Sequence, residues 1–204
     1  MIDAKAAARF IETGFKNCPS YCDELNELDA RLGDGDLGTT VSKCSECVKE
    51  MMKSDAWKKG KEEGESLSEY FKMTALACAK ASGSSFGTLL AQGFLTASKE
   101  TAEKSFLTSS DLSALIDHIV EGLMKRGGAV LGDKTMLDSL SAISDALKKV
   151  EHPEFIQIIE AAESTVIEFR DKPNKIGRAR MFSERSIGLE DPGQVAILRF
   201  LQNA

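Results

Sequence analysis

The segment LDARLGDGDLGTT, residues 28–40, ends one expected helix and leads into the next. It places Asp29, Asp34 and Asp36 within eight residues and interleaves them with glycines. Glycine permits the sharp turns through which closely spaced carboxylates converge, and it lets phosphate oxygens approach the main chain. Mg²⁺ prefers hard oxygen ligands and often shares them with substrate phosphates. The segment therefore indicates a magnesium and phosphate site between two helices, with an ordinary polar turn as the alternative.

An EF-hand calcium loop is the nearest rival interpretation of these aspartates. Such a loop needs acidic or amide residues at its first, third and fifth positions and a glutamate at its twelfth. Counted from Asp34, the fifth position is Gly38 and the twelfth is Ser45. The pattern therefore excludes an EF-hand.

Outward from this loop, apolar residues recur at helical spacing and capping residues mark helix starts. Ser66 and Glu69 form a capping box before an apolar run. The charged stretch from Trp57 to Glu65 contains two glycines and is expected to be a connector. The expected helices cover residues 4–17, 20–28, 39–52, 66–80, 86–103, 109–127, 135–150 and 153–169, and a short segment from 191. Since the sequence shows no strand alternation or hairpin signature, it predicts one all-α domain over residues 1–204.

The composition narrows the classes of function. The formal net charge is −6, whereas general nucleic-acid binding needs a basic face. No apolar run approaches the roughly 18 residues of a membrane span, and the N-terminus does not resemble a signal peptide. Five cysteines make an odd count without disulfide-like density, which is typical of a reducing compartment. We therefore expect a cytoplasmic protein that binds neither nucleic acid nor membrane.

The usual nucleophile and metal motifs are missing. Only two histidines occur, His118 and His152, and both lie far in sequence from the Asp-Gly loop, so a Ser-His-Asp or Cys-His site is not expected. The Cys44-x-x-Cys47 pair has no second Cys or His pair and is interpreted as structural. Walker A and protein-kinase motifs are also missing from the sequence.

Four further clusters suit anion binding at helix ends: KASGSSFGT from Lys80, GDKTMLD from Gly132, IGRAR from Ile176 and ERSIGLEDPG from Glu184. Small residues before a helix can cradle phosphate through backbone amides, although a serine-rich cap explains them equally well. Lys134 is expected either to meet phosphate or to face solvent. Arg178 lies in a glycine-containing loop that could bring its guanidinium to a phosphate. If these loops share one end of a helical bundle, they form a single site.

The order of these five clusters resembles the nucleotide-binding DhaL family of dihydroxyacetone kinases over nearly the whole chain. The resemblance implies an eight-helix antiparallel barrel that binds ADP or ATP and two Mg²⁺ ions at one end. By this resemblance, Asp29, Asp34 and Asp36 match the metal ligands, and Arg178 matches the phosphate-side arginine that serves catalysis. The positions that match nucleotide contacts are Leu37, Gly38, Thr39, Thr40, Ala81, Ser82, Gly127, Met136, Arg178, Asp191, Pro192 and Gly193.

Two positions depart from the family pattern. Leu37 stands where the family commonly has a histidine, and Ser84-Ser85 stands where Gly-Pro is common. The leucine offers no polar contact near the phosphates, whereas the expected metal ligands are all retained. Nucleotide binding therefore remains the expectation, while the turnover rate and the phosphodonor stay open.

The resemblance also implies a partner, because in this family the dihydroxyacetone site lies on a separate subunit or domain. We expect a homodimer or a hetero-oligomer that includes this substrate-binding subunit, acting on dihydroxyacetone or another short ketose. The phosphodonor is either exchangeable ATP or a phosphotransferase-system protein that rephosphorylates a retained ADP, and a standalone subunit favours the second. A non-catalytic nucleotide-sensing subunit is the alternative from a different class.

Overall fold

The computed structural model describes residues 1–63, 66–81 and 83–204, and the regular secondary structure of these residues is almost entirely helical. Eight of their helices have eleven or more residues: α1 (Ala4–Asn17), α3 (Leu37–Met52), α5 (Leu67–Ala81), α6 (Ser85–Glu100), α7 (Ser109–Gly127), α8 (Met136–Lys149), α9 (Phe155–Phe169) and α10 (Pro192–Gln202). Shorter helical pieces are α2 (Cys22–Ala30), α4 (Asp55–Glu63) and the 3₁₀ segments η1 (Cys18–Tyr21) and η2 (Arg178–Ser186). The all-α prediction is confirmed.

Two short strands correct the expectation that the chain contains none. β1 (Ile2–Asp3) pairs antiparallel with β2 (Phe106–Leu107), with Ile2 opposite Leu107. Each strand has two residues, which is too short for alternation to show in the sequence. The pairing joins the N-terminus to the loop before α7.

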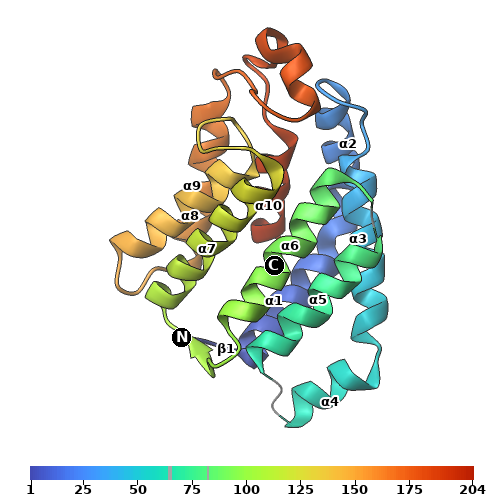
Figure 1. Ribbon diagram of the computed structural model, residues 1–204, viewed down its shortest axis with the longest axis vertical. Coiled ribbons are helices and arrows are strands. Elements are labelled where there is room, and N and C mark those ends of the chain that lie inside the picture. Colours follow the sequence, from blue (N-terminus) through green and yellow to red (C-terminus); the bar gives the residue numbers. More distant parts are fainter. Residues whose placement is uncertain (64–65, 82) are drawn as a thin grey trace.

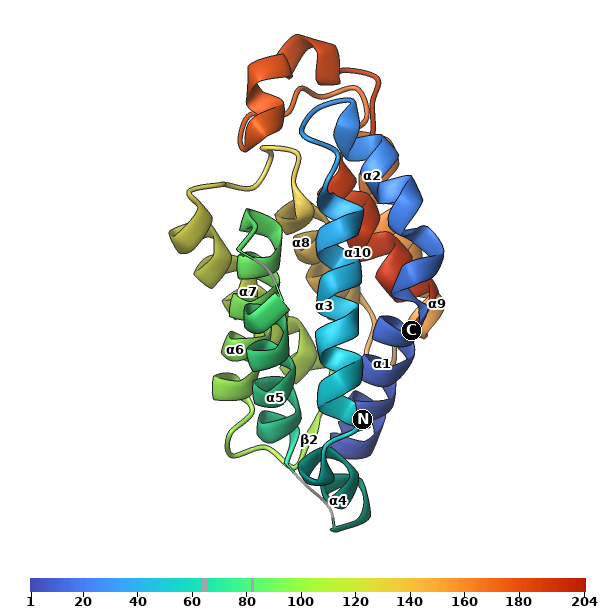
Figure 2. The same ribbon diagram turned by 90° about the vertical axis from the view of Figure 1, so that its right-hand side faces the viewer.

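The long helices run up and down along the long axis (Figures 1 and 2), and their contacts close into a ring. Around the ring, α3 contacts α5, α5 contacts α6, and the contacts continue through α7 and α8 to α10, which returns to α2. Helix α1 packs inside this order against α3, α5 and α10. The up-and-down order places the α2–α3, α5–α6, α7–α8 and α9–α10 connections at one end, the upper end in both figures. All five sequence clusters therefore reach the same end of the barrel.

Local sequence signals explain where most helices begin. Asp3 caps α1 by accepting a hydrogen bond from the Ala6 amide at 2.8 Å. Thr108 with Asp111, and Thr135 with Asp138, form complete capping boxes for α7 and α8. At the predicted capping box before α5, the backbone amide of Glu69 donates to the Ser66 hydroxyl at 3.2 Å.

The prediction of a connector at Trp57 is wrong, because Asp55–Glu63 forms α4. The Trp57 side chain is buried, packs edge-on against Tyr70 with ring centroids 4.7 Å apart, and donates from Nε1 to Glu12 at 2.7 Å. This anchoring stabilises a helix that is rich in charged residues, and the local composition does not reveal it. Residues 64 and 65, the end of the predicted connector, lie outside the described residues.

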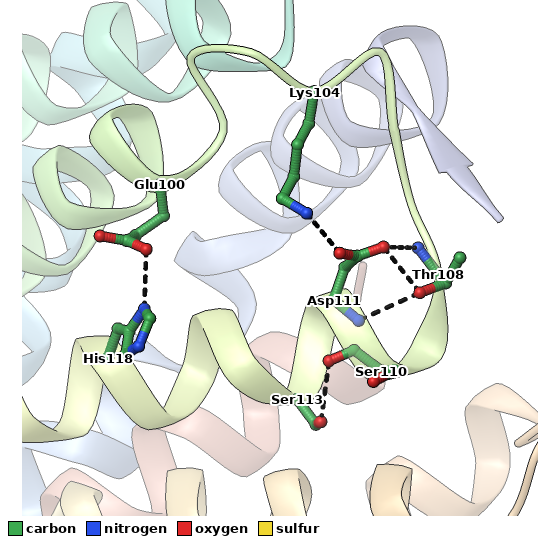
Figure 3. Close-up of polar contacts among 7 residues, drawn as sticks. All are labelled: Glu100, Lys104, Thr108, Ser110, Asp111, Ser113 and His118. Carbon is green, nitrogen blue, oxygen red and sulfur yellow. Dashed lines mark hydrogen bonds and ion pairs between the residues drawn. The ribbon is translucent and has the colours of Figure 1, made fainter.

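Side-chain polar contacts hold the opposite end of the barrel, where α6 passes into α7 (Figure 3). Glu100 at the end of α6 pairs with His118 on α7 at 2.7 Å. Lys104, in the following loop, pairs with the capping residue Asp111. These contacts stabilise the α6–α7 turn, which lies at the end of the barrel opposite the predicted site.

The five cysteines are all free thiols. Cys18, Cys22, Cys44 and Cys78 are buried, and Cys47 is half-buried. Burial raises the pKa of the Cys18 thiol to about 11, so this thiol stays protonated at neutral pH. Within the described part of the chain, each helix is too short or too polar to cross a membrane.

Candidate functional site

The three aspartates of the Asp-Gly loop converge. Asp29 lies in the last turn of α2, and Asp36 immediately precedes α3. Asp29, Asp34 and Asp36 each offer a carboxylate oxygen within 4.8 Å of the others. Asp34 and Asp36 are exposed and Asp29 is half-buried, so the cluster opens to solvent. Among the described residues, no other group of three or more acidic, cysteine or histidine side chains comes as close together.

Asp29 also organises the start of α3. Its Oδ2 accepts hydrogen bonds from the amides of Asp36 at 2.9 Å and Leu37 at 3.3 Å. Asn26, one turn earlier on α2, accepts from the amide of Thr39 at 3.0 Å and donates to its hydroxyl at 3.3 Å. The side chain of Asp36 makes no capping bond. Amides at the N-terminus of α3 are thus satisfied within the protein, while the Asp36 carboxylate is not needed for capping.

Close packing accounts for the glycines in this loop. A Cβ at Gly38 would lie 1.8 Å from the carbonyl oxygen of Cys22, so α3 can approach α2 only with glycine there. Gly35 has φ +72°, a left-handed conformation that glycine adopts readily. The two glycines bring α2 and α3 together and thereby close the carboxylate cluster.

Arg178 reaches this cluster from the far part of the sequence. It begins η2, which lies over the α2–α3 loop in both views (Figures 1 and 2). Its Nη1 forms an ion pair with Asp34, and both side chains remain substantially exposed. An expected phosphate-side arginine and an expected metal ligand are therefore in direct contact.

The start of α6 joins the same end of the barrel through Thr40. The Thr40 side chain is buried, and its hydroxyl lies 3.2 Å from the hydroxyl of Ser84. Ser84 caps α6 by accepting from the amide of Gly87 at 3.1 Å. Ala81, the last residue of α5, is half-buried against the main core. Ser82, the other residue expected in this phosphate loop, lies outside the described residues.

The remaining expected contacts gather where α8 and α10 begin. The side chain of Met136 is buried at the start of α8, and a Cβ on Gly193 would lie 3.7 Å from that of Met136. Pro192 is buried in the first turn of α10. Gly127 ends α7, is exposed, and faces Leu89 of α6. The structure thus brings Met136, Pro192 and Gly193 together and places Gly127 at the end of the neighbouring helix.

Asp191 is buried and has a clear structural role. Its Oδ1 accepts from the amide of Gln194 at 2.9 Å and caps α10, while Oδ2 accepts from Asn174 Nδ2 at 2.8 Å. Burial raises the pKa of this carboxyl to about 6, although these hydrogen bonds and the charge of Lys134 act in the opposite direction. The carboxylate of Asp191 is therefore committed within the protein.

Both expectations for Lys134 are wrong. Its side chain is fully buried and neither faces solvent nor stands free to meet a phosphate. Its ammonium instead donates to backbone carbonyls of the loop that carries Arg178. Desolvation lowers the pKa of this group. Asn26, Lys134 and Asn174 are site residues that the sequence did not single out as supports.

The surface also has a depression of about 230 Å³, whose lining differs from the carboxylate cluster. It is lined by Leu28, Arg31, Arg170, Gly188, Leu189 and Glu190. Arg170 is paired with Glu190 across it. None of the expected metal or nucleotide residues lines this depression.

The fold and the site define a helical-barrel domain with a carboxylate cluster and an arginine-bearing loop at one end. Comparison with known families gives the same class: the DAK2 domain model matches residues 31–204. The chain belongs to the DAK2 domain family, which confirms the resemblance to DhaL proteins.

Curated relatives are about 31–32% identical to this chain over the segments that align. The ADP-binding subunit DhaL of a PTS-dependent dihydroxyacetone kinase from Lactococcus lactis is 32% identical, over 83% of this chain and 79% of that protein. D-erythrulose kinase from Mycolicibacterium smegmatis is 31% identical over 96% of this chain, and human triokinase/FMN cyclase is 31% identical over 88%. The chain spans about a third of the length of the last two proteins, 34% and 31% respectively.

Solved structures show the same fold. The dihydroxyacetone kinase of C. freundii superimposes with a TM-score of 0.71 in its native form and 0.69 in complex with AMP-PNP and Mg²⁺. Sequence identity is 20%, and the match covers 97% of this chain and 33% of that one. At this identity the likeness supports the fold alone.

Proposed function

We propose that this chain binds ADP or ATP together with Mg²⁺ and supplies the nucleotide half of a dihydroxyacetone kinase. The contact that carries the proposal is the ion pair between Arg178 and Asp34, at the carboxylate cluster. Phosphoryl transfer needs positioning and charge neutralisation more than covalent chemistry by the protein. A cluster of carboxylates beside an exposed guanidinium meets both requirements.

The donor set fits magnesium. Asp29, Asp34 and Asp36 offer hard oxygen ligands close enough to share one centre, and their exposure leaves room for phosphate oxygens. Asp36 is free of capping, whereas Asp29 shares its charge with the amides of α3. When bound, Mg²⁺ neutralises phosphate charge and orients the phosphate oxygens. Two ions, as the family resemblance implies, belong to the proposal.

Arg178 has two roles available to it. In the free protein its guanidinium neutralises Asp34, which reduces repulsion among three adjacent carboxylates. With Mg²⁺ and nucleotide bound, we propose that the guanidinium turns to the phosphates and offsets charge that develops during transfer. The exposure of both partners allows this exchange without repacking of the core.

The remaining contacts enclose the nucleotide. We propose that Leu37, Gly38, Thr39 and Thr40 border the phosphates, with Ala81 and Ser82 on the α5–α6 side, while Gly127, Met136, Asp191, Pro192 and Gly193 border the rest of the nucleotide. The closeness of Met136 to Gly193 supports this grouping. Since Asp191 is committed to α10, we assign it the role of shaping this wall rather than of direct contact through its carboxylate.

The acceptor and the phosphodonor lie outside the described site. The names of the relatives, which include PTS-dependent dihydroxyacetone kinase and D-erythrulose kinase, support a short ketose as the acceptor. We propose that a substrate-binding subunit holds dihydroxyacetone and acts together with this chain. The chain itself is proposed to form a homodimer or to join that subunit in a hetero-oligomer, in the cytoplasm. A retained ADP that a phosphotransferase-system protein rephosphorylates is the preferred donor route, with exchangeable ATP as the other.

One observation favours a second candidate, a nucleotide-sensing regulatory subunit. Leucine stands at position 37, where the family commonly has histidine; its side chain is apolar and buried, and therefore offers the phosphates no polar group. Such a subunit would retain the Mg²⁺ and nucleotide site without transferring phosphate.

Reconstituted transfer separates these two functions. The protein is combined with a dihydroxyacetone kinase substrate-binding subunit and dihydroxyacetone, with ATP or with phosphotransferase-system components as donor, and dihydroxyacetone phosphate is measured. Formation of product that disappears with Asp34→Asn supports the kinase. Mg²⁺-dependent ADP binding without product under either donor condition supports the regulatory subunit.

A further inference from the structure

The side chain of Lys134 enters the barrel end rather than the solvent. It lies in the loop between α7 and α8, has φ 63°, and is fully buried. Its Nζ donates to the carbonyl oxygens of Arg170 at 3.1 Å, Lys172 at 2.8 Å and Ser186 at 2.9 Å. An ammonium group has three donors, so each is used.

This arrangement is costly, which indicates a specific purpose. A non-glycine residue in the left-handed region is uncommon and adds backbone strain. A buried ammonium also loses its hydration, and its direct hydrogen-bond partners are carbonyl oxygens, with the carboxylates of Asp191 and Asp171 acting on it only through their charge. Three carbonyl dipoles compensate for that loss. A neutral side chain of similar shape would avoid the cost if Lys134 served packing alone.

The three carbonyls lie at the two ends of one loop. Arg170 and Lys172 precede it and Ser186 closes it, so a single ammonium draws both ends together. The amide of Gly188 reinforces this closure by donating to the Arg170 carbonyl at 2.9 Å. Residues 173–185, which include Arg178, therefore form a loop that is pinned at its base.

Asn174 ties this base to the rest of the site. The backbone amide of Asn174 donates to the Ser186 hydroxyl at 2.8 Å. Its side-chain Nδ2 donates to the Lys134 carbonyl and to Asp191 Oδ2, both at 2.8 Å. The loop is thus attached to the start of α8 through Lys134 and to the start of α10 through Asp191. Its tip, which carries Arg178, projects over the α2–α3 loop (Figure 2).

We infer that Lys134 is a positioning residue that pins the Arg178 loop, so that the guanidinium is held over the carboxylate cluster where the phosphates bind. The inference rests on the proposed function for the role of Arg178 and on the described contacts for the pinning. Without the ammonium, the ends of the loop separate and Arg178 is no longer presented to Asp34.

A double-mutant cycle with Lys134→Met and Arg178→Ala tests this coupling. Methionine matches the unbranched apolar part of the lysine side chain and removes its donors. In the wild-type background, Arg178→Ala should weaken Mg²⁺-ADP binding on the order of tenfold, the effect of one charge-assisted hydrogen bond. In the Lys134→Met background, the same change should cost less than about twofold, because the guanidinium is already misplaced.

Lys172→Met provides the matched control. Lys172 lies at the same loop base, but its ammonium is exposed, pairs with Glu168 at 2.7 Å and stacks over Phe169. This variant should leave the effect of Arg178→Ala unchanged. Equal effects of Arg178→Ala in the wild-type and Lys134→Met backgrounds would overturn the inference.

Limited trypsin digestion gives a readout that does not depend on nucleotide. The loop contains the cleavable residues Lys175, Arg178, Arg180 and Arg185. Lys134→Met should be cut there several-fold faster than wild type or Lys172→Met, at matched helical content by circular dichroism, and equal rates overturn the pinning. If Lys134→Met does not fold, Lys134→Leu, which also lacks donors, replaces it with the same expectations. If wild type binds no Mg²⁺-ADP, the proposed function fails while the digestion still tests the pinning.

Discussion

Replacing Gly38 with alanine tests whether the contact between α2 and α3 builds the carboxylate cluster. The added Cβ would lie 1.8 Å from the carbonyl oxygen of Cys22, 2.7 Å from its carbonyl carbon and 2.9 Å from Asn26 Oδ1. Ordinary contacts begin near 3.4 Å, so the N-terminus of α3 must retreat by about 1.6 Å. Two of these atoms are backbone, which cannot rotate away.

The expected effect on stability is a balance of two terms. Alanine in a helix is favoured over glycine by about 1 kcal/mol. Overpacking that shifts backbone costs about 1–3 kcal/mol and occasionally more, and a contact this short belongs at the upper end. We expect a net loss of about 2 kcal/mol in the free energy of unfolding. The shift also parts Asp29 from the amides of Asp36 and Leu37, so Mg²⁺ affinity should fall as well.

Urea unfolding monitored by circular dichroism measures the first effect, and calorimetric titration of Mg²⁺ with ADP measures the second. Gly93→Ala on α6 is the control, because its Cβ would meet only Ile119 Cγ2, at 3.6 Å. That variant should gain up to about 1 kcal/mol. If Gly38→Ala proves as stable as wild type and binds Mg²⁺-ADP equally well, the account of how the cluster is built is wrong.

Two further predictions concern α4 and the buried carboxyl of the α10 cap. Trp57→Phe removes the 2.7 Å hydrogen bond to Glu12 and part of the packing on Tyr70. The free energy of unfolding, measured with urea, should therefore fall by about 1.5–3 kcal/mol. An unchanged urea midpoint contradicts the anchoring of α4. Asp191 has a folded pKa of about 6 and an ordinary value of 3.8, so between these values the folded protein holds a proton that the unfolded chain releases. The contribution of Asp191 to stability therefore falls as pH rises from about 4 to about 6, by at most about 3 kcal/mol at 1.4 kcal/mol per pH unit. The stability difference between wild type and Asp191→Asn should decline by that amount from pH 4 to pH 7, and a difference that does not vary with pH refutes the assignment.

Most of the barrel could be predicted from the sequence because its signals are local. Capping residues such as Asp3, Thr135 and Asp191 mark helix starts that the structure confirms. Helix α4 could not be predicted in this way. Its stability depends on the burial of Trp57 between elements distant in sequence, while its own composition is charged and contains glycine.

The structure brings together the three aspartates and Arg178, which sequence patterns singled out, whereas the residues that support them were not predicted. The aspartates and Arg178 stand in sequence patterns that indicate phosphate chemistry, whereas Lys134 resembles any loop lysine. Its burial follows from where the α9–α10 loop passes, which no local pattern encodes. The role of Asn26 could have been predicted, because it lies one helical turn before Asp29 on the face of α2 that meets α3.

Calorimetric titration of ADP into the nucleotide-stripped protein, with and without Mg²⁺, tests the central claim most directly when wild type is compared with Asp34→Asn. The account predicts binding to wild type that depends on Mg²⁺ and that weakens strongly in Asp34→Asn, since one of three converging carboxylates is neutralised. Because Asp34 is exposed, both proteins should unfold at similar urea concentrations. Equal affinity of the two proteins for ADP in the presence of Mg²⁺, or no binding to wild type under either condition, would contradict the proposed metal and nucleotide site.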